Sequence, residues 1–598
     1  MITKMTKYSF VVLSGETPGF LAKLQELGMM DINREEKPVD NYSRELADKL
    51  TRITQLSSKL KEAAKEKEIT VTGTEYNDSA EAFLDETAKL FARIDVLRNE
   101  VDVLRDFIRT ATPWGDFSKE DLDKIVRLGF TLHAYVTPVK RMNPEWEKEY
   151  PLFELNRTEG NIYFVVLEIP GTPYSFPLNE TQFPSLPYTT LIKNCTQKEN
   201  ELKACRERLS FLAVHRDILK VYATEVSSEL DLYMASVSGD KQVEGYIDLL
   251  TGFIPTEHTQ ELEKFLEKES LYYVSSPADI EDNPPVKLKN NWFTRLFEPI
   301  GNMYMLPVYS ELDLTPYFAP FYMLFFGLCL GDMGYGLLLM VTGLAGKFFL
   351  PKMRGYLNLA FFLGLGSFLM ASLSGSFFGM KVIDLFPAVG NVQDFFFLFS
   401  DMKMFWFAIL FGLFQIIFAR ILTGIDSMIR KGWQHGMAPF GWAILIIWCT
   451  LAYASTMVPG LKLPKEISTV MLIVSVSLII LFSKPEGPIY KRFGKGLWAM
   501  YDITGVFGDM LSYIRLFGLG TSGGILGMVI NTLAISLSGV PYIGWLLTVV
   551  LLLIGHALVL GLSALGAFVH PMRLTFVEFY KNAGFTGGGR AYKPLKIK

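Results

Sequence analysis

Hydrophobic and polar residues follow different patterns in the two halves of the chain. Up to about residue 300, short apolar stretches alternate with strongly polar ones, whereas the rest of the chain consists mainly of long apolar runs with few charges. A helix needs about 20 predominantly apolar residues to cross a membrane. The pattern therefore predicts a soluble region at 1–300 and a membrane region at 301–598.

Helical repeats dominate the first region. Apolar residues recur with 3/4 spacing between charged ones over about 40–110, with a β-prone interruption at 69–73, and again over about 190–235. Such spacing is typical of helices that pair along a narrow seam. We expect the two runs to form an antiparallel coiled-coil hairpin.

Strand-like segments lie before, between and after these helical runs. Residues 6–32 indicate a strand followed by a helix, while 130–136 and 163–169 indicate a small α/β lobe at the far end of the hairpin. A second lobe follows at 243–255, before a proline-rich linker at 282–285. Together with the hairpin, these lobes predict an interaction scaffold.

Composition excludes several other kinds of protein. The net charge of −4, the six histidines and the four cysteines argue against a nucleic-acid-binding protein and a secreted disulfide scaffold. The chain has neither a glycine-rich phosphate loop nor cysteines at metal-ligand spacing, so we expect no cofactor and no catalytic role. No signal peptide is recognisable, which predicts that the soluble region stays in the cytoplasm.

Charge is divided unevenly between the two regions. The first carries a net −13 and the second a net +9. In the second region, lysines and arginines gather at alternate ends of the apolar runs. All of these basic clusters lie on the same side of the membrane only if the segment 316–349 crosses the membrane twice. The sequence therefore predicts a mainly α-helical, multi-pass cell-membrane protein with eight spans and both termini cytoplasmic. The expected spans are 316–331, 333–349, 356–380, 402–424, 438–458, 467–483, 501–535 and 542–582.

The last two apolar runs are much longer than a perpendicular crossing, so we expect tilted helices or helices that extend into water. Arg515 lies about 20 Å along the first of them, too deep to reach the surface easily. It should face protein or a water-filled cavity and needs an anionic partner, which another subunit could supply. Arg573, on the second, is either an interfacial anchor or a mid-membrane residue.

Other polar residues in the apolar runs have two interpretations each. Asp502, Asp509 and Glu578 lie toward the cytoplasmic end, where they could cap helices or line an aqueous entrance. Asp332 is expected to be a turn residue between short spans. His556 and Gln415 are expected to make interhelical hydrogen bonds more than to bind ions.

Six segments form a series of motifs along the chain: 24–28, 283–290, 309–316, 320–336, 511–516 and 572–579. In sequence, order and spacing they resemble the membrane stator subunit of V-type and A-type rotary ATPases, called subunit a or subunit I, in its prokaryotic form. The resemblance covers nearly the whole chain.

The resemblance implies a mechanism. The two long helices would embrace a rotor ring of c/K-type proteolipid subunits, each with one membrane carboxylate, and form one ion half-channel to each side. The subunit would thereby couple translocation of H⁺ or Na⁺ to ATP hydrolysis or synthesis. Arg515 would be the essential arginine, Arg573 the second arginine and His570 part of the outer half-channel. The remaining ion-translocation candidates are Asp502, Asp509, Ser512, His556 and Glu578.

The resemblance also implies partners for the soluble region, namely peripheral-stalk subunits and the central-stalk connector subunit. Two departures affect the outer half-channel: Gly523 and Ser563 stand where some eukaryotic members have His and Glu. Asp509 stands where those members have His. The outer path therefore cannot be transferred from them.

Two alternative functions make different demands on the sequence. A stand-alone secondary transporter or channel with a cytoplasmic regulatory domain would be expected to show paired intramembrane acids and inverted repeats, and the sequence has neither. A membrane-anchored scaffold without transport would make Arg515 purely structural.

Overall fold

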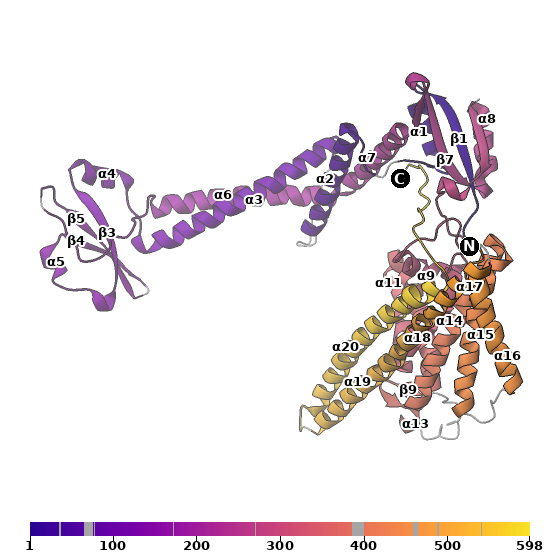
Figure 1. Cartoon of the computed structure of the whole chain (residues 1–598). Coiled ribbons are helices and arrows are strands. Elements are labelled where there is room, and N and C mark those ends of the chain that lie inside the picture. The colour runs from indigo at the N-terminus through magenta and orange to yellow at the C-terminus, as the bar shows by residue number, and fades with distance from the viewer. Residues whose placement is uncertain are drawn as a thin grey trace. The chain divides into compact units, whose positions relative to one another are not determined.

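Figure 1 shows a computed structural model of the chain, in which two compact units can be distinguished. One unit comprises 1–10 and 251–594, and the other 11–250 and 595–598. The residues described are 1–34, 37–64, 76, 78–158, 160–171, 173–269, 271–385, 400–457, 464–486, 489–539 and 541–597. The domain boundary expected near residue 300 remains a prediction.

The boundary between the units runs through two strands, β1 (Met5–Leu13) and β7 (Ile247–Pro255). They belong to a sheet of order β2-β7-β1-β8, with β6 paired to β7. The other elements near this sheet in the sequence are α1 (Thr17–Leu27), β2 (Asp31–Ile32), β6 (Asp240–Gln242), α8 (Thr259–Glu269), β8 (Tyr272–Pro277) and α9 (Trp292–Asn302). The strand and helix predicted within 6–32 are confirmed.

Four long helices occupy the predicted helical runs: α2 (Asn41–Ala63), α3 (Ala80–Ala111), α6 (Tyr188–Val214) and α7 (Asp217–Val237). α3 packs against α6, and α2 against α7. The second run is broken at 215–216, yet Leu212 and Leu219 on either side of the break are both fully buried. The break thus keeps the apolar stripe on the inside. The interruption expected at 69–73 lies outside the described residues, and the coiled coil remains a prediction.

The start of α2 illustrates how local chemistry fixes a helix end. Asp40 accepts a hydrogen bond from the Ser43 backbone N–H, and the Ser43 hydroxyl in turn accepts one from the Asp40 backbone, forming a capping box. Hydrogen bonds from Ser43 and Tyr233 lower the pKa of Asp40 to about 2. Asp40 is therefore held ionised, which suits the positive end of the helix dipole.

The α/β lobe predicted between the helical runs contains a three-stranded antiparallel sheet of order β3-β5-β4. Its strands are β3 (Thr131–Pro138), β4 (Leu152–Thr158) and β5 (Asn161–Glu168), with the helices α4 (Lys119–Arg127) and α5 (Trp146–Glu149) beside them in the sequence. Tyr135, Phe164 and Val166 form its core. In Figure 1 this lobe lies at the end of the α3–α6 pair.

The remaining unit is dominated by apolar helices. Among the residues that the structure describes, six helices are long and apolar enough to cross a membrane: Pro351–Ser374, Asp401–Lys431, Trp433–Thr456, Lys465–Phe482, Arg492–Ser538 and Gly544–Asn582. Two shorter apolar helices, α10 (Thr315–Leu330) and α11 (Met333–Phe349), precede them. The structure thus has an apolar helix at each of the eight expected spans, and the eight crossings themselves remain a prediction.

The individual helices of this region are α12 (Arg354–Ser374), α13 (Val382–Leu385), α14 (Asp401–Lys431), α15 (Trp433–Met457), α16 (Lys465–Phe482), α17 (Ile489–Ala499), α18 (Ile503–Ser512), α19 (Ile514–Ser538), α20 (Gly544–Arg573) and α21 (Tyr580–Asn582). The third expected span, 356–380, is longer than α12. After Ser374, Gly375 adopts a left-handed conformation that ends the helix, and β9 (Ser376–Phe377) pairs with β10 (Met380–Lys381).

Small residues allow the apolar helices to approach closely. A Cβ on Gly327 of α10 would lie 2.2 Å from the Gly366 carbonyl oxygen of α12, so no larger side chain fits there. Around this contact lies a large aromatic core that includes Phe318, Phe325 and Tyr322. α19 and α20, the yellow helices of Figure 1, run side by side and carry four of the eight candidate ion-translocation residues, namely Arg515, His556, His570 and Arg573.

Candidate functional site

Arg515 is positioned by the junction between α18 and α19. The helical hydrogen-bond pattern is interrupted at Tyr513, whose fully buried ring lies against α14. Gly412 of α14 makes room for that ring, because a Cβ there would lie 2.1 Å from a ring carbon. The Tyr513 hydroxyl donates a 2.9 Å hydrogen bond to Gln415 Oε1, which confirms the interhelical bond expected of Gln415. These contacts fix the backbone two residues before Arg515.

The guanidinium of Arg515 is only partly paired. Arg515 is half-buried, and within the described part of the chain it forms no ion pair and its buried Nη1 has no hydrogen-bond partner. Cys329 and His570 lie close enough to interact with it electrostatically. His570 also interacts with Arg573, the exposed last residue of α20. His570 thus lies within electrostatic range of both predicted arginines, Arg515 and Arg573.

A second group of polar residues lies where α18 meets the end of the α20 segment. We call Asp509, Ser512, Glu578, Lys581 and Asn582 the carboxylate cluster. Lys581 Nζ lies 3.2 Å from both carboxylate oxygens of Asp509, and Asn582 Nδ2 donates a 2.9 Å hydrogen bond to one of them. Asp509 is buried, while the Lys581 side chain is 48% exposed. The negative charge of Asp509 is thus compensated by a cation that reaches the surface.

Glu578 lies in the same cluster without such compensation. It is 1% exposed, and its Oε2 has no hydrogen-bond partner among the residues that the structure describes. Ser512 is a hydrogen-bonding neighbour of its carboxyl group. The π-helix Leu574–Phe579, which follows α20, places Glu578 beside α18. A free carboxyl oxygen at a buried site can accept a proton or a cation without breaking an existing hydrogen bond.

Asp502 lies apart from the carboxylate cluster's hydrogen bonds. It is exposed, and its Oδ2 lies 3.4 Å from Nη2 of Arg420 on α14. This ion pair joins the start of α18 to α14. Asp502 thus has a structural partner, and its role in an aqueous entrance remains a prediction.

A third polar group links α11, α19 and α20. We call Tyr335, His556 and Asn531 the histidine chain. The Tyr335 hydroxyl lies 2.8 Å from His556 Nδ1, and His556 Nε2 lies 3.0 Å from Asn531 Oδ1. Asn531 then donates a 2.7 Å hydrogen bond to the Phe378 carbonyl oxygen. The interhelical hydrogen bond expected of His556 is confirmed.

Asp332 lies at the turn between α10 and α11, as expected, and is completely buried. Its carboxylate accepts hydrogen bonds from four backbone N–H groups and one hydroxyl. The donors are Gly334, Tyr335, Ser376, Phe378 and Gly379. Asp332 therefore caps α11 and at the same time fixes the β9–β10 hairpin against it.

Gly523 and Ser563, the two positions that depart from the eukaryotic pattern, face each other. A Cβ on Gly523 would lie 3.3 Å from the Ser563 hydroxyl oxygen. The two departures thus affect one place between α19 and α20. A small hydroxyl side chain and a glycine leave more space there than His and Glu would.

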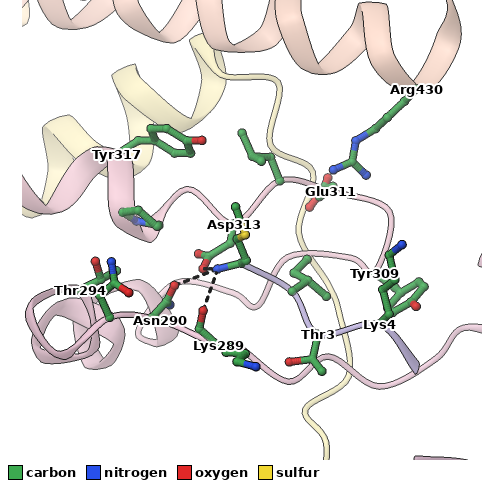
Figure 2. Close-up of a pocket in the computed structure, with 15 residues that line it drawn as sticks. Thr3, Lys4, Lys289, Asn290, Thr294, Tyr309, Glu311, Asp313, Tyr317 and Arg430 are labelled. Carbon is green, nitrogen blue, oxygen red and sulfur yellow. Dashed lines mark hydrogen bonds and ion pairs between the residues drawn. The ribbon is translucent and has the colours of Figure 1, made fainter. Parts of the chain in front are cut away.

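A separate pocket of about 680 Å³ lies beside the N-terminal residues Met1–Lys4 (Figure 2). The terminal amino group of Met1 lies 2.9 Å from both Asp313 Oδ2 and Asn290 Oδ1. The other acid in this pocket, Glu311, accepts hydrogen bonds from the backbone N–H groups of Thr586 and Gly587. Both acids therefore hold chain segments together. Across the described residues, no three His, Cys, Asp or Glu side chains are grouped as a metal site requires.

Sequence reasoning missed several members of these groups. Lys581 and Asn582 end the last expected span, 542–582, where they read as a simple hydrophilic flank, and Tyr335 and Tyr513 read as apolar core residues. One signal was available: Asn531, like His556, is a polar residue in the middle of an apolar run. The pairings themselves join residues up to 221 positions apart.

Comparison with known proteins gives consistent matches. A profile described as the V-type ATPase 116kDa subunit family matches residues 183–355. The chain is 25% identical to "V-type ATP synthase subunit I" of Borreliella burgdorferi over 100% of this chain and 99% of that protein. It is 28% identical to "A-type ATP synthase subunit I" of Methanocaldococcus jannaschii over 67% of this chain and 63% of that protein.

Among the solved structures that match is the cytoplasmic N-terminal domain of subunit I, a homologue of subunit a of V-ATPase. It covers 45% of this chain and 100% of that domain, with 14% sequence identity and a TM-score of 0.20. That score is too low to support an argument about the fold.

Proposed function

Because the chain belongs to the family of subunit I of V-type and A-type ATP synthases, we propose that it is the membrane stator of a rotary ATPase. In this role it forms two ion half-channels against a rotor ring and couples H⁺ or Na⁺ translocation to ATP hydrolysis or synthesis. It carries out no catalysis of its own. The complex lies in the cell membrane of a bacterium or archaeon.

The observation that carries this proposal is the incompletely paired guanidinium of Arg515. A guanidinium stays charged at any working pH, and an unpaired charge at membrane depth is costly. Within the described residues Arg515 has no carboxylate partner, and its buried Nη1 makes no hydrogen bond to any of them. An ionised carboxylate from a rotor subunit is a suitable partner, since it would neutralise Arg515 at each step of rotation.

This partnership explains coupling. As a rotor carboxylate approaches Arg515, the positive charge favours its ionised form and so promotes release of the bound ion into one half-channel. The same charge repels a cation that would pass directly from one half-channel to the other. Ions can then cross only by riding on the rotor, so that transport requires rotation.

The two polar groups supply the half-channels. We assign the carboxylate cluster, at the lysine- and arginine-rich end of the helices, to the cytoplasmic side, with Asp502 at its entrance. The histidine chain, together with the space beside Ser563, is assigned to the outer side. Arg515, His570 and Arg573 lie between them. The same distribution of charge supports eight crossings with both termini in the cytoplasm.

The other unit supplies the stator's contacts with soluble subunits. Its paired helices expose many charged side chains, including ion pairs such as Arg105 with Glu199 across α3 and α6. We assign this surface to peripheral-stalk subunits and to the central-stalk connector subunit. Such attachments would resist the torque of the rotor.

The test is Arg515→Ala in the complete complex, reconstituted into liposomes. We expect the complex to assemble while ATP-driven ion uptake is abolished. Arg515→Lys, which keeps the charge, should retain part of the activity, and Arg354→Ala, which removes an exposed arginine of the same region, should be unaffected. Retained coupled uptake in Arg515→Ala would overturn the proposal. Ion flux through the purified chain without its partner subunits would instead favour a stand-alone channel.

A further inference from the structure

An apolar groove of about 780 Å³ lies between three membrane helices and does not contribute to the proposed ion path. Its floor is formed by residues 405–413 of α14, one wall by 442–454 of α15, and the other by 503–514 of α18 and the start of α19. Leu410, Phe507 and Leu511 in this groove are each between 45% and 58% exposed. The volume falls within the range of about 300–1,000 Å³ that is typical of sites for small molecules.

The depth of the groove follows from the length and charge pattern of α14. This helix has 31 residues, which is about 46 Å at about 1.5 Å per residue. The hydrocarbon core of a membrane is only about 30 Å thick, so one end of α14 must project beyond it. Residues 404–419 carry no charge, whereas Arg420, Asp426, Arg430 and Lys431 follow. Arg420 therefore lies at the boundary between the hydrocarbon core and the headgroups.

Arg420 also lies at one end of the groove. Its guanidinium carbon is 5.7 Å from the ring centroid of Trp442, and Trp442 itself lines the groove. The Arg420 side chain is only 15% exposed. Its Nη2 forms a 3.4 Å contact with Asp502, and its buried Nε has no hydrogen-bond partner among the described residues. Arg420 thus places a cation, with one unpaired N–H donor, at the end of an otherwise apolar groove.

We propose that one phospholipid occupies this groove, with its phosphate bound by Arg420 and an acyl chain lying between α14, α15 and α18. The chemistry matches at both ends. Phosphate oxygens accept hydrogen bonds from arginine readily. The walls expose few polar atoms and hold water poorly, whereas an acyl chain can lie against them at little desolvation cost. A free phosphate would satisfy Arg420 and leave the groove unfilled, which is why the occupant is a lipid.

A bound lipid would act as a spacer in the stator. The groove lies between α15 and α18, and α18 is followed directly by Tyr513 and Arg515. An acyl chain between them would support α18 from the side opposite its contacts with the carboxylate cluster. The inference is independent of the ion path, because it requires only that α14 spans a membrane.

Native mass spectrometry of the intact membrane complex, purified in mild detergent, tests the proposal. After extensive washing, the wild-type complex should retain one phospholipid for each copy of this chain. Arg420→Gln should reduce that occupancy at least tenfold. Arg430→Gln, which alters an arginine of the same helix that pairs with Asp426 beyond the groove, is the matched control and should retain the lipid.

Two further variants separate lipid binding from simple structural support. Asp502→Asn breaks the ion pair with Arg420 but leaves the guanidinium, so the lipid should be retained, whereas a purely structural role would make it resemble Arg420→Gln. Cys449→Trp fills the groove and should displace the lipid while Arg420 is intact. Absence of a tightly bound phospholipid in the wild type, or equal occupancy in Arg420→Gln, overturns the proposal. So does a groove occupied by a helix of another subunit, which would protect Cys449 from thiol reagents in the complex without any bound lipid.

Discussion

The carboxylate cluster and the histidine chain both line the α18–α20 segment, on either side of Arg515, yet they are built from different chemistry. The first contains two buried acids, Asp509 and Glu578, a partly exposed lysine and a free carboxyl oxygen. The second is a continuous series of neutral hydrogen bonds through Tyr335, His556 and Asn531. The carboxylate cluster can hold a negative charge or exchange a proton, whereas the neutral hydrogen bonds of the histidine chain mainly orient its own side chains.

Asp332 shows why the second side carries little free charge. Although it is an acid beside the histidine chain, all of its nearby donors are neutral and both of its oxygens are engaged. Its charge is therefore used to hold α11 and the β9–β10 hairpin together. Asp332 thus differs from Glu578, whose Oε2 has no hydrogen-bond partner among the described residues.

The largest expected effect is on stability. Asp332→Ala leaves two buried and three partly buried donors without this acceptor, and we expect the free energy of unfolding to fall by about 3 kcal/mol or more. Thermal unfolding of the full chain in detergent measures this. Asp401→Ala, at an exposed position in the first turn of α14, is the control and should change stability by less than about 0.5 kcal/mol. A mild effect of Asp332→Ala would mean that the carboxylate is not the fixed anchor described above.

Next in size is the effect of Glu578→Gln on transport. This change keeps the shape of the side chain but removes its ability to exchange a proton or bind a cation. We expect ATP-driven ion uptake by the reconstituted complex to fall about a hundredfold, the lower range of effects for proton-transfer groups. Uptake within twofold of the wild type would show that Glu578 does not take part in ion transfer. Glu578 would then be a structural acid like Asp332.

Gly412→Ala tests how Arg515 is positioned. The added Cβ would overlap the Tyr513 ring at 2.1 Å, so Tyr513 must shift and its bond to Gln415 should weaken. Overpacking of this kind costs about 1–3 kcal/mol. At Gly518 no described atom lies within 4 Å of an added Cβ, so Gly518→Ala should not destabilise the chain. Equal melting temperatures for the two variants would show that α18 is not held by this contact.

A smaller effect is expected for the histidine chain. His556→Phe removes two hydrogen bonds while keeping an aromatic ring, and Tyr335→Phe removes one. We expect ion uptake to fall about fivefold for His556→Phe, equivalent to about 1 kcal/mol. The fall should be less for Tyr335→Phe. If His556→Phe were as damaging as Glu578→Gln, the two sides of Arg515 would be chemically alike.

The smallest effect should come from Lys581→Met. Because the lysine is half-exposed and Asn582 also bonds Asp509, we expect a loss of less than about 1 kcal/mol in stability. Thermal unfolding at low and high salt checks this, since the loss should shrink as salt screens the ion pair. A larger loss that does not depend on salt would show that Lys581 is a structural anchor.

Apolar periodicity was sufficient to place the helices, because burial in a membrane or in a helix pair depends on residue type and spacing alone. The long apolar run also drew attention to Arg515, because a charged side chain at that depth in a membrane is costly in any fold. Apolar periodicity could not supply the partners of Asp509 and Tyr513, since Lys581 and Gln415 are 72 and 98 residues away and only helix packing brings them together. The end of α12 was missed because Gly375, which ends it, reads as one more small residue in an apolar run.

The central claim is that two ion paths open on opposite sides of Arg515, and cysteine labelling in oriented vesicles of the complete complex tests it most directly. In a Cys449→Ser background, Ser512→Cys should react with a membrane-impermeant thiol reagent only from the cytoplasmic side. Ser563→Cys should react only from the outer side. Reaction of both cysteines from the same side, or of either one from both sides, would contradict the account.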